Sequence, residues 1–238
     1  NGDAVTCLLT SSIACPTGNP ATSNAITMTV NPLLPVSVSI ASSGNTVCAG
    51  TTVSFTATPV NGGANPAYQW RVNGTAVSGA TNSSYSYVPV NGDAVSCVVT
   101  SNALCPTGSP ATSNTITLTV NPLLPVSVSI ASSGNTVCAG TMVSFTATPV
   151  NGGSSPAYQW NVNGNNVSGA TGATYSYVPV NGDAVSCVLT SNALCPTGNP
   201  ATSNTITMTV NPLLPVSATI FSSANTVCAG TTVNFTST

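Results

Sequence analysis

The segment TTVSFTAT at residues 51–58 alternates apolar and polar side chains from its third residue onward. Val53, Phe55 and Ala57 therefore share one face of an extended chain, and hydroxylated side chains occupy the other face. A period of two residues is typical of a half-buried β-strand that packs one face against a core. The segment predicts such a strand and points to a β-sheet protein.

The neighbouring segments have the same character. The sequence AYQWRV at residues 67–72 places Tyr68 and Trp70 on one face and leads into an Asn-Gly pair at 73–74, which favours a hairpin turn. Further short strands are expected at residues 36–40, 84–88, 94–101 and 115–120. About seven short strands at this spacing, without a helical period, predict an all-β sandwich.

The chain repeats itself with a period of 90 residues. The motif NGDAV begins at residues 1, 91 and 181, and NPLLPVS begins at residues 31, 121 and 211. Similarity at a fixed period is the signature of a tandem array. The chain therefore divides into the C-terminal part of one repeat (1–30), two full repeats (31–120 and 121–210) and the N-terminal part of another (211–238).

The differences between the two full repeats gather in one segment. The repeats differ at 12 positions, and eight of these lie between Ala64 and Ser84, including the change from Arg71 to Asn161. This concentration predicts an exposed loop region, because packed strands tolerate little change. Neutral sequence drift on a surface loop explains this concentration of differences at least as well as a binding role does.

Charge is nearly absent from the chain. The four charged residues are Asp3, Arg71, Asp93 and Asp183. Nucleic acids and anionic lipids are bound through clustered Lys and Arg, so neither is an expected partner. No apolar run reaches the roughly 18 residues of a membrane helix, so no membrane insertion is expected either.

No catalytic or metal site is expected. The chain has no His, Lys or Glu, so a nucleophile would lack a base, and one Asp per repeat cannot form a carboxylate pair. Zinc-type Cys spacing is missing, and a single Asp is too little for a strong calcium site. We predict a protein that is not an enzyme and binds no cofactor or metal. Asp93 is expected to cap the turn that precedes the next strand.

Three segments resemble immunoglobulin-like domains: AGTTVSFTA, YQW and GDAVSCVVTSNA stand in the order of strands B, C and F. Trp70, and Trp160 in the next repeat, take the place of the core tryptophan on strand C. Over essentially the full chain, the repeat is similar to the Ig-like or PKD-like repeats of giant secreted surface proteins of Bacteroidota. This resemblance implies an extracellular, cell-surface location and a role in adhesion or gliding. The usual inter-sheet disulfide is missing, because Ala57 and Val99 stand at its two positions.

Periodic cysteines in a secreted array indicate disulfides, and this chain has three per repeat. In the Ig-like reading, Cys97 points inward near the start of strand F, and Cys48 precedes strand B at the same end of the sandwich. We therefore expect a Cys48–Cys97 bond, repeated as Cys138–Cys187.

The remaining cysteine of each repeat lies in the long loop between the last two strands. These residues are Cys15, Cys105 and Cys195. An odd cysteine could cross-link to a neighbouring repeat or to another chain. A Cys48–Cys105 bond and a buried free thiol stay open as alternatives.

The junction between the full repeats contains the sequence Pro122-Leu123-Leu124-Pro125. Proline fixes its own φ and restricts the residue before it, so a short, stiff connection is expected. Leu123 and Leu124 are expected to pack between domains. One repeat should advance roughly 35–45 Å along the array, from the length of its strands and end loops.

These features lead to two hypotheses. The first is a non-catalytic extracellular protein that forms a rigid stalk or filament at the bacterial cell surface and self-associates as a homopolymer or bundle, because near-zero net charge promotes association. The alternative is an adhesin module that binds glycans or surfaces through the variable region 64–84. Exposure of Trp70 or Tyr68 would favour the adhesin, and burial of both would count against it.

Overall fold

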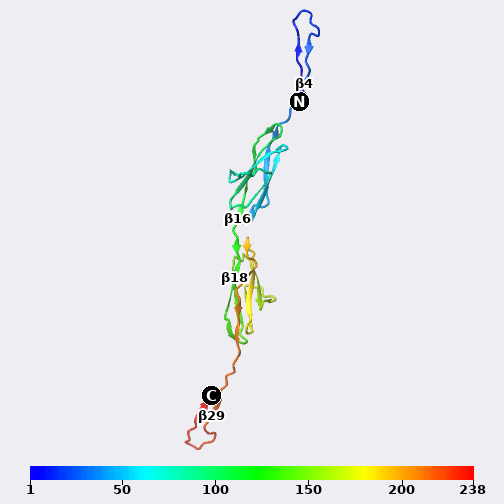
Figure 1. Ribbon diagram of the computed structural model, residues 1–238. Helices are drawn as coiled ribbons and strands as arrows, with labels where there is room; N and C mark the ends of the chain where they lie inside the picture. Colours follow the sequence, from blue (N-terminus) through cyan, green and yellow to red (C-terminus); the bar gives the residue numbers. More distant parts are fainter. The chain divides into compact units, whose positions relative to one another are not determined.

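The computed structural model describes all residues, 1–238, and its secondary structure consists of β-strands and turns. No helix in it has the length and apolar character needed to cross a membrane. The chain separates into two compact units, Asn1–Leu123 and Leu124–Thr238, which are described one at a time (Figure 1).

The first unit contains the full repeat 31–120, drawn from cyan to green in Figure 1. Its strands are β5 (Leu34–Pro35), β6 (Ser37–Ser42), β7 (Thr46–Cys48), β8 (Val53–Val60), β9 (Ala67–Val72), β10 (Thr75–Ala76), β11 (Ser84–Tyr87), β12 (Ala94–Thr100), β13 (Pro106–Thr107), β14 (Ala111–Thr112), β15 (Ile116–Thr117) and β16 (Thr119–Asn121).

Two sheets form the body of this repeat. One has the strand order β6-β8-β11, and the other has the order β10-β9-β12-β14, with β15 also paired to β12. All of these pairs are antiparallel. Two short parallel pairs, β5 with β13 and β7 with β16, fasten the first and last residues of the repeat to its body. This is the strand arrangement of an immunoglobulin-like sandwich.

The core lies between the inward faces of the two sheets. On β8, Val53 and Phe55 are fully buried and Ala57 nearly so, while the residues between them are exposed. On the facing sheet, Trp70 of β9 stands opposite Cys97 of β12, and both are fully buried. Burying one large apolar side chain stabilises a fold by roughly 1.5–3 kcal/mol, so this alternation holds the sheets together.

The outer face of the β6-β8-β11 sheet is hydroxylated. Ser54, Thr56 and Thr58 of β8 are exposed, as is Ser86 of β11. The Ser86 hydroxyl donates to the Ser54 hydroxyl at 2.8 Å across the two strands. Small hydroxylated side chains therefore give this sheet a polar surface without charge.

The second unit contains residues 124–210 of the second full repeat, whose strands follow the same order. They are β17 (Leu124–Pro125), β18 (Ser127–Ser132), β19 (Thr136–Cys138), β20 (Val143–Val150), β21 (Ala157–Val162), β22 (Asn165–Asn166), β23 (Thr174–Tyr177), β24 (Ala184–Thr190), β25 (Pro196–Thr197), β26 (Ala201–Thr202), β27 (Ile206–Thr207) and β28 (Thr209–Asn211). Its sheets have the orders β18-β20-β23 and β22-β21-β24-β26. Phe145 and Trp160 occupy the centre of its core.

The two partial repeats form small hairpins. Residues 1–30 contain β1 (Ala4–Val5), β2 (Leu8–Leu9), β3 (Ala21–Thr22) and β4 (Ile26–Thr27), with β1 paired to β4 and β2 paired to β3. Residues 211–238 contain β29 (Ile220–Ser222) paired to β30 (Phe235–Ser237). Their apolar side chains are exposed, because the strands that cover the equivalent positions in a full repeat are not part of these segments.

The expected all-β, immunoglobulin-like sandwich is confirmed. The strand expected at 67–72 is β9, and the strand expected at 51–58 is β8, displaced by two residues to Val53–Val60. The short parallel pairs at the ends of the repeat were not expected, because strands of two or three residues carry no periodic pattern.

Candidate functional site

The tryptophans are core residues. The Trp70 ring is fully buried, and its indole N–H donates to the backbone carbonyl of Asn82 at 2.9 Å. The ring lies 6.0 Å from Phe55 and 5.8 Å from Tyr85, centroid to centroid, a spacing at which aromatic pairs add roughly 0.5–1.5 kcal/mol. Trp160 is buried in the same way in the second repeat. Neither ring can stack on an external ligand.

Tyr68 also packs against the core of its repeat, where it is half-buried beside the buried cluster. Trp70 is thus fully buried on β9, and Tyr68 is partly buried. This counts against the form of the adhesin hypothesis that relies on stacking of these rings.

Asp93 forms a buried polar cluster at the turn before β12. Its carboxylate is only 5% exposed. One oxygen accepts hydrogen bonds from the Val90 N–H and the Tyr87 hydroxyl, both at 3.0 Å, and the other accepts from the Asn73 amide at 2.9 Å. The Asn73 side-chain carbonyl in turn accepts from the Ala94 N–H at 2.9 Å. The cluster holds the turn to the hairpin that follows β9.

The cluster shifts the pKa values of its two acidic groups in opposite directions. Burial alone would raise the pKa of Asp93, but the hydrogen bonds from Val90, Asn73 and Tyr87 outweigh it and lower the pKa. Burial and the neighbouring carboxylate raise the pKa of the Tyr87 hydroxyl. Asp93 therefore stays ionised and Tyr87 stays neutral at ordinary pH, which makes them a structural pair rather than an acid–base pair.

The second repeat reproduces this cluster. Asp183 is 5% exposed and accepts from Val180, Tyr177 and Asn163 at 2.9–3.0 Å. Asp3, the equivalent residue in the partial repeat, is exposed. The structure also contains no group of three or more His, Cys, Asp or Glu side chains that could hold a metal ion.

The variable segment 64–84 lies on the surface. All eight positions that differ between the repeats in this segment are exposed in the first full repeat. They occupy the loop before β9, the β9–β10 hairpin and the turn into β11. Arg71, the single basic side chain, points outward from β9, whereas the equivalent Asn161 has a buried side-chain oxygen without a hydrogen-bond partner.

The expected bonds Cys48–Cys97 and Cys138–Cys187 do not form, and the prediction is wrong. Cys97 and Cys187 are fully buried free thiols in the middle of β12 and β24, and Cys138 is an exposed free thiol. Cys48 instead ends β7, where its register partner is Asn121, the residue directly after the repeat 31–120. Burial raises the pKa of the Cys97 thiol, so it stays protonated and unreactive.

The third cysteine of each repeat lies at the opposite end. The Cys105 carbonyl accepts a hydrogen bond from the Leu34 N–H at 3.0 Å, beside the first strand of its repeat. Cys15 and Cys105 carry free thiols, and so does Cys7 in the partial repeat. Cys48 and Cys195 are disulfide-bonded.

The junction residues differ in how firmly they are held. Leu124 and Pro125 form β17, which pairs with β25 of their own repeat, and Leu124 is half-buried there. Leu123 is 47% exposed. Pro122 and Leu123 belong to no strand, since β16 ends at Asn121.

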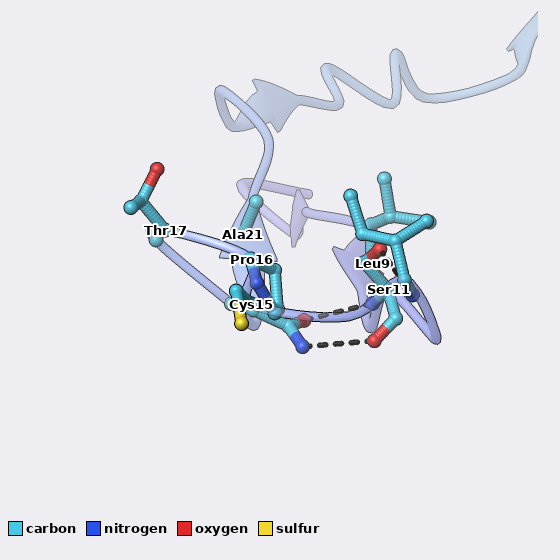
Figure 2. Close-up of a pocket in the computed structure, with 9 residues that line it drawn as sticks. Leu9, Ser11, Cys15, Pro16, Thr17 and Ala21 are labelled. Carbon is cyan, nitrogen blue, oxygen red and sulfur yellow. Dashed lines mark hydrogen bonds between the residues drawn. The ribbon is translucent and has the colours of Figure 1, made fainter.

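A hollow of about 320 Å³ lies in the partial repeat (Figure 2). It is lined by Leu9, Ser11, Ile13, Cys15, Pro16, Thr17, Gly18, Asn19 and Ala21. The Asn19 side chain closes its rim by two hydrogen bonds to the Ser11 backbone, at 2.8 and 2.9 Å. In the full repeats, the residues equivalent to Pro16 and Thr17 pair with β5 and β17. The hollow thus lies beside the position at which the full repeats pair with their first strand.

Comparison with known proteins gives one relative by sequence and several similar structures. No protein-family model matches the chain. The chain is 33% identical over 171 residues to the highly immunogenic outer capsid protein of Enterobacteria phage T4, a match that covers 67% of this chain. The chain spans 45% of the length of that relative.

The similar structures include three N-terminal domains of the highly immunogenic outer capsid protein of bacteriophage RB49, at 12% identity and a TM-score of 0.32, covering 85% of this chain and 68% of that one. Fibronectin(III)-like modules of Clostridium thermocellum CbhA match at 15% identity and a TM-score of 0.31, covering 74% of this chain and 94% of that one. By its own strand topology and its 90-residue repeat, the chain is a tandem array of immunoglobulin-like β-sandwiches, and it has sequence similarity to a phage outer capsid protein.

Proposed function

We propose that the chain is part of a non-catalytic array of immunoglobulin-like repeats that acts as a spacer and display stalk on an outer surface. The observation that carries this proposal is the near-identity of the two full repeats, in which most differences are exposed and the core and Asp clusters recur. A chain that repeats one fold with so little change fits a role set by the number and stiffness of its units.

The junction supports a stiff stalk. Leu34 and Val36 donate backbone hydrogen bonds to Cys105 and Thr107 at 3.0 and 2.9 Å, so the chain enters a repeat as a paired strand. It leaves the repeat as β16, also paired, and only Pro122 and Leu123 lie between β16 and β17. A connection of two residues, one of them proline, has few backbone conformations.

The relative supports a virion as the outer surface in question. The T4 protein is an outer capsid protein by name, and its similarity to this chain extends over 171 residues. The resemblance to Bacteroidota surface repeats supports a stalk or filament on a bacterial cell instead. Both locations are extracellular, and we place the virion first because its support is a measured sequence similarity.

Self-association of the stalk is a separate part of the proposal. The exposed Ser and Thr side chains of the β6-β8-β11 sheet carry no charge, and the whole chain has a net charge of −2. Two such surfaces repel each other little, and near-zero net charge promotes association. Sedimentation velocity at low and high salt tests this: concentration-dependent species that do not respond to salt are expected, and a monomer at every concentration would contradict it.

A second candidate is a binding surface for glycans or other surfaces on segment 64–84. The exposure of all eight variable positions favours it. Recognition there would use the polar side chains of the β9–β10 hairpin, because Trp70 is buried. A glycan array probed with both full repeats tests this candidate, and binding by one repeat but not the other would support it.

Immunoelectron microscopy tests the main proposal. Gold-labelled antibody raised against the chain should mark the outside of intact particles, at a distance from the particle wall that grows with the number of repeats in the parent protein. Label on virions supports the capsid location, and label on cells supports the cell-surface location. Label confined to the particle interior or the cell lysate would overturn the display role.

A further inference from the structure

The sheet β6-β8-β11 ends on one side at β11, and no further strand pairs with it. In an antiparallel ladder, alternate residues turn both their backbone N–H and their C=O toward the partner strand. The Ala57 N–H donates to the Ser83 carbonyl at 2.9 Å, so residues 83, 85 and 87 face β8. The backbone N–H and C=O groups of Ser84 and Ser86 therefore lie along the outer edge of the sheet, where both residues are exposed.

The opposite edge of the same sheet is closed by a side chain. On β6, the Ser43 N–H donates to the Ser54 carbonyl at 2.8 Å, so by the same alternation Ile40 faces away from β8. The Ile40 N–H donates to the Asn114 side-chain oxygen at 2.8 Å, and the Ile40 carbonyl accepts from the Asn114 amide at 3.2 Å. Asn114 thus occupies the two backbone groups that an added strand would need at the middle of this edge.

The second full repeat has the same two edges. Ile130 of β18 makes both bonds to the side chain of Asn204, at 2.8 and 3.2 Å. At the other side β23 ends its sheet, and its outward residues Thr174 and Ser176 are exposed. One closed edge and one open edge are therefore features of the repeat rather than of one copy.

The open edge lacks the devices that usually prevent strand addition, which are charged side chains, prolines and bulges. Residues 81–90 and 171–180 contain no charged residue, and Pro89 comes only after β11. The four residues of β11 pair with β8 in an unbroken register. The edge strands of the facing sheet, β10 and β14, have two residues each, so β11 offers the longer open edge.

We propose that the open edge of β11 is a self-assembly surface, to which the same edge of a second copy of this chain adds as an antiparallel strand. The edge is self-complementary about a twofold axis at Tyr85. Ser84 then lies opposite Ser86 of the second copy, and each such pair exchanges two N–H···O=C bonds. Small, uncharged side chains on both copies allow this approach without repulsion. The three-stranded sheets of the two copies become one continuous sheet, and Asn114 closes its outer edges.

The inference rests on the proposed self-association of the stalk, because it names the contact that produces it. Ser86→Pro removes the outward N–H, while the bonds to β8 come from residues 83, 85 and 87 and are kept. Because β23 has the same edge, the test variant combines Ser86→Pro with Ser176→Pro. The matched control combines Ser86→Ala with Ser176→Ala, which removes the hydroxyl bonds across the strands but keeps both outward N–H groups.

Sedimentation velocity over a concentration series compares the three proteins. Wild type and the alanine control should associate equally, and the proline variant should stay monomeric, with urea unfolding followed by tryptophan fluorescence to show that it is folded. Association of the proline variant at wild-type concentrations would overturn the edge contact and leave self-association standing. Loss of association in the alanine control would also overturn it, because hydroxyl groups would then make the contact. A wild type that is monomeric throughout would reject self-association itself, and the edge contact with it.

Amide hydrogen exchange followed by NMR tests the wild-type chain without any substitution. The N–H groups of Ser84 and Ser86 should exchange quickly in dilute protein and should slow in proportion to the fraction of chain that is associated. The Ile40 N–H is the internal reference, because Asn114 holds it at every concentration. Fast exchange of Ser84 and Ser86 in an associated sample would overturn the inference. Slowing that requires another protein would overturn the second copy as the occupant of the edge.

Discussion

Asp93→Asn should destabilise the first full repeat without changing its fold. The carboxylate accepts three hydrogen bonds, two on one oxygen and one on the other. An asparagine can accept on one oxygen only, so its NH₂ group must face either the Asn73 amide or the pair formed by Val90 and Tyr87. Asn73 cannot flip freely to compensate, because its carbonyl is held by the Ala94 N–H.

The loss amounts to one charge-assisted hydrogen bond and a buried donor without a partner. Such a bond contributes roughly 1.5–3 kcal/mol, so we expect the free energy of unfolding of this repeat to fall by about 2–3 kcal/mol. For a domain of this size that corresponds to a midpoint lowered by roughly 10–20 °C. Tyr87 could rotate to accept from an NH₂ group, but the Val90 N–H could not.

Urea unfolding followed by tryptophan fluorescence is a suitable assay, because each full repeat has one buried tryptophan. In Asp93→Asn, about half of the fluorescence amplitude should move to lower urea and the rest should stay. Asp183→Asn should move the other half. Asp3→Asn is the matched control, since Asp3 is exposed, and should change nothing. An unchanged transition in Asp93→Asn would refute the structural role of the cluster.

Three further outcomes are expected. The pKa values of Asp93 and Asp183 are lowered on folding, so the stability that these carboxylates contribute is present above pH about 4 and is lost as the pH falls further. The urea midpoints of both full repeats should therefore drop in acid. In Asp93→Asn, the midpoint of the first full repeat should drop less in acid. Tyr87→Phe should lower the free energy of unfolding by about 1–2 kcal/mol at neutral pH. Because folding raises the pKa of Tyr87, the wild-type protein should lose stability as the pH rises above about 10, and the Tyr87→Phe variant should lose less. Gly63→Ala should cost about 3 kcal/mol in thermal unfolding, because its Cβ would lie 2.6 Å from the Ala103 N. Gly79→Ala, where φ is also positive (75° against 82°) but the space is open, should cost about 1 kcal/mol.

The main sheets of the fold were predictable because their pattern is local. The alternation of Val53, Phe55 and Ala57 identifies a strand and its buried face. The 90-residue period indicates that both full repeats have the same fold. The turn role expected of Asp93 is also visible in the cluster that it forms. These features depend on residues near each other in sequence, where side-chain spacing maps directly onto backbone geometry.

The disulfide prediction failed because it depended on contacts between distant segments. No pattern near Cys48 reveals that β7 pairs in parallel with β16, more than 70 residues later. That pair carries Cys48 to the exit of the repeat, while Cys97 stays inside the sandwich opposite Trp70. The left-handed backbone of Cys105 was equally hidden, since only the folded loop requires it.

Small-angle X-ray scattering of the chain in solution tests the central claim most directly, because a spacer must keep its repeats extended. The account predicts a cross-section of one sandwich and a maximum dimension of at least about 70–90 Å for the two full repeats, from an advance of roughly 35–45 Å per repeat. The length should not change with salt. A compact, nearly spherical particle, with the two repeats folded against each other, would contradict the account.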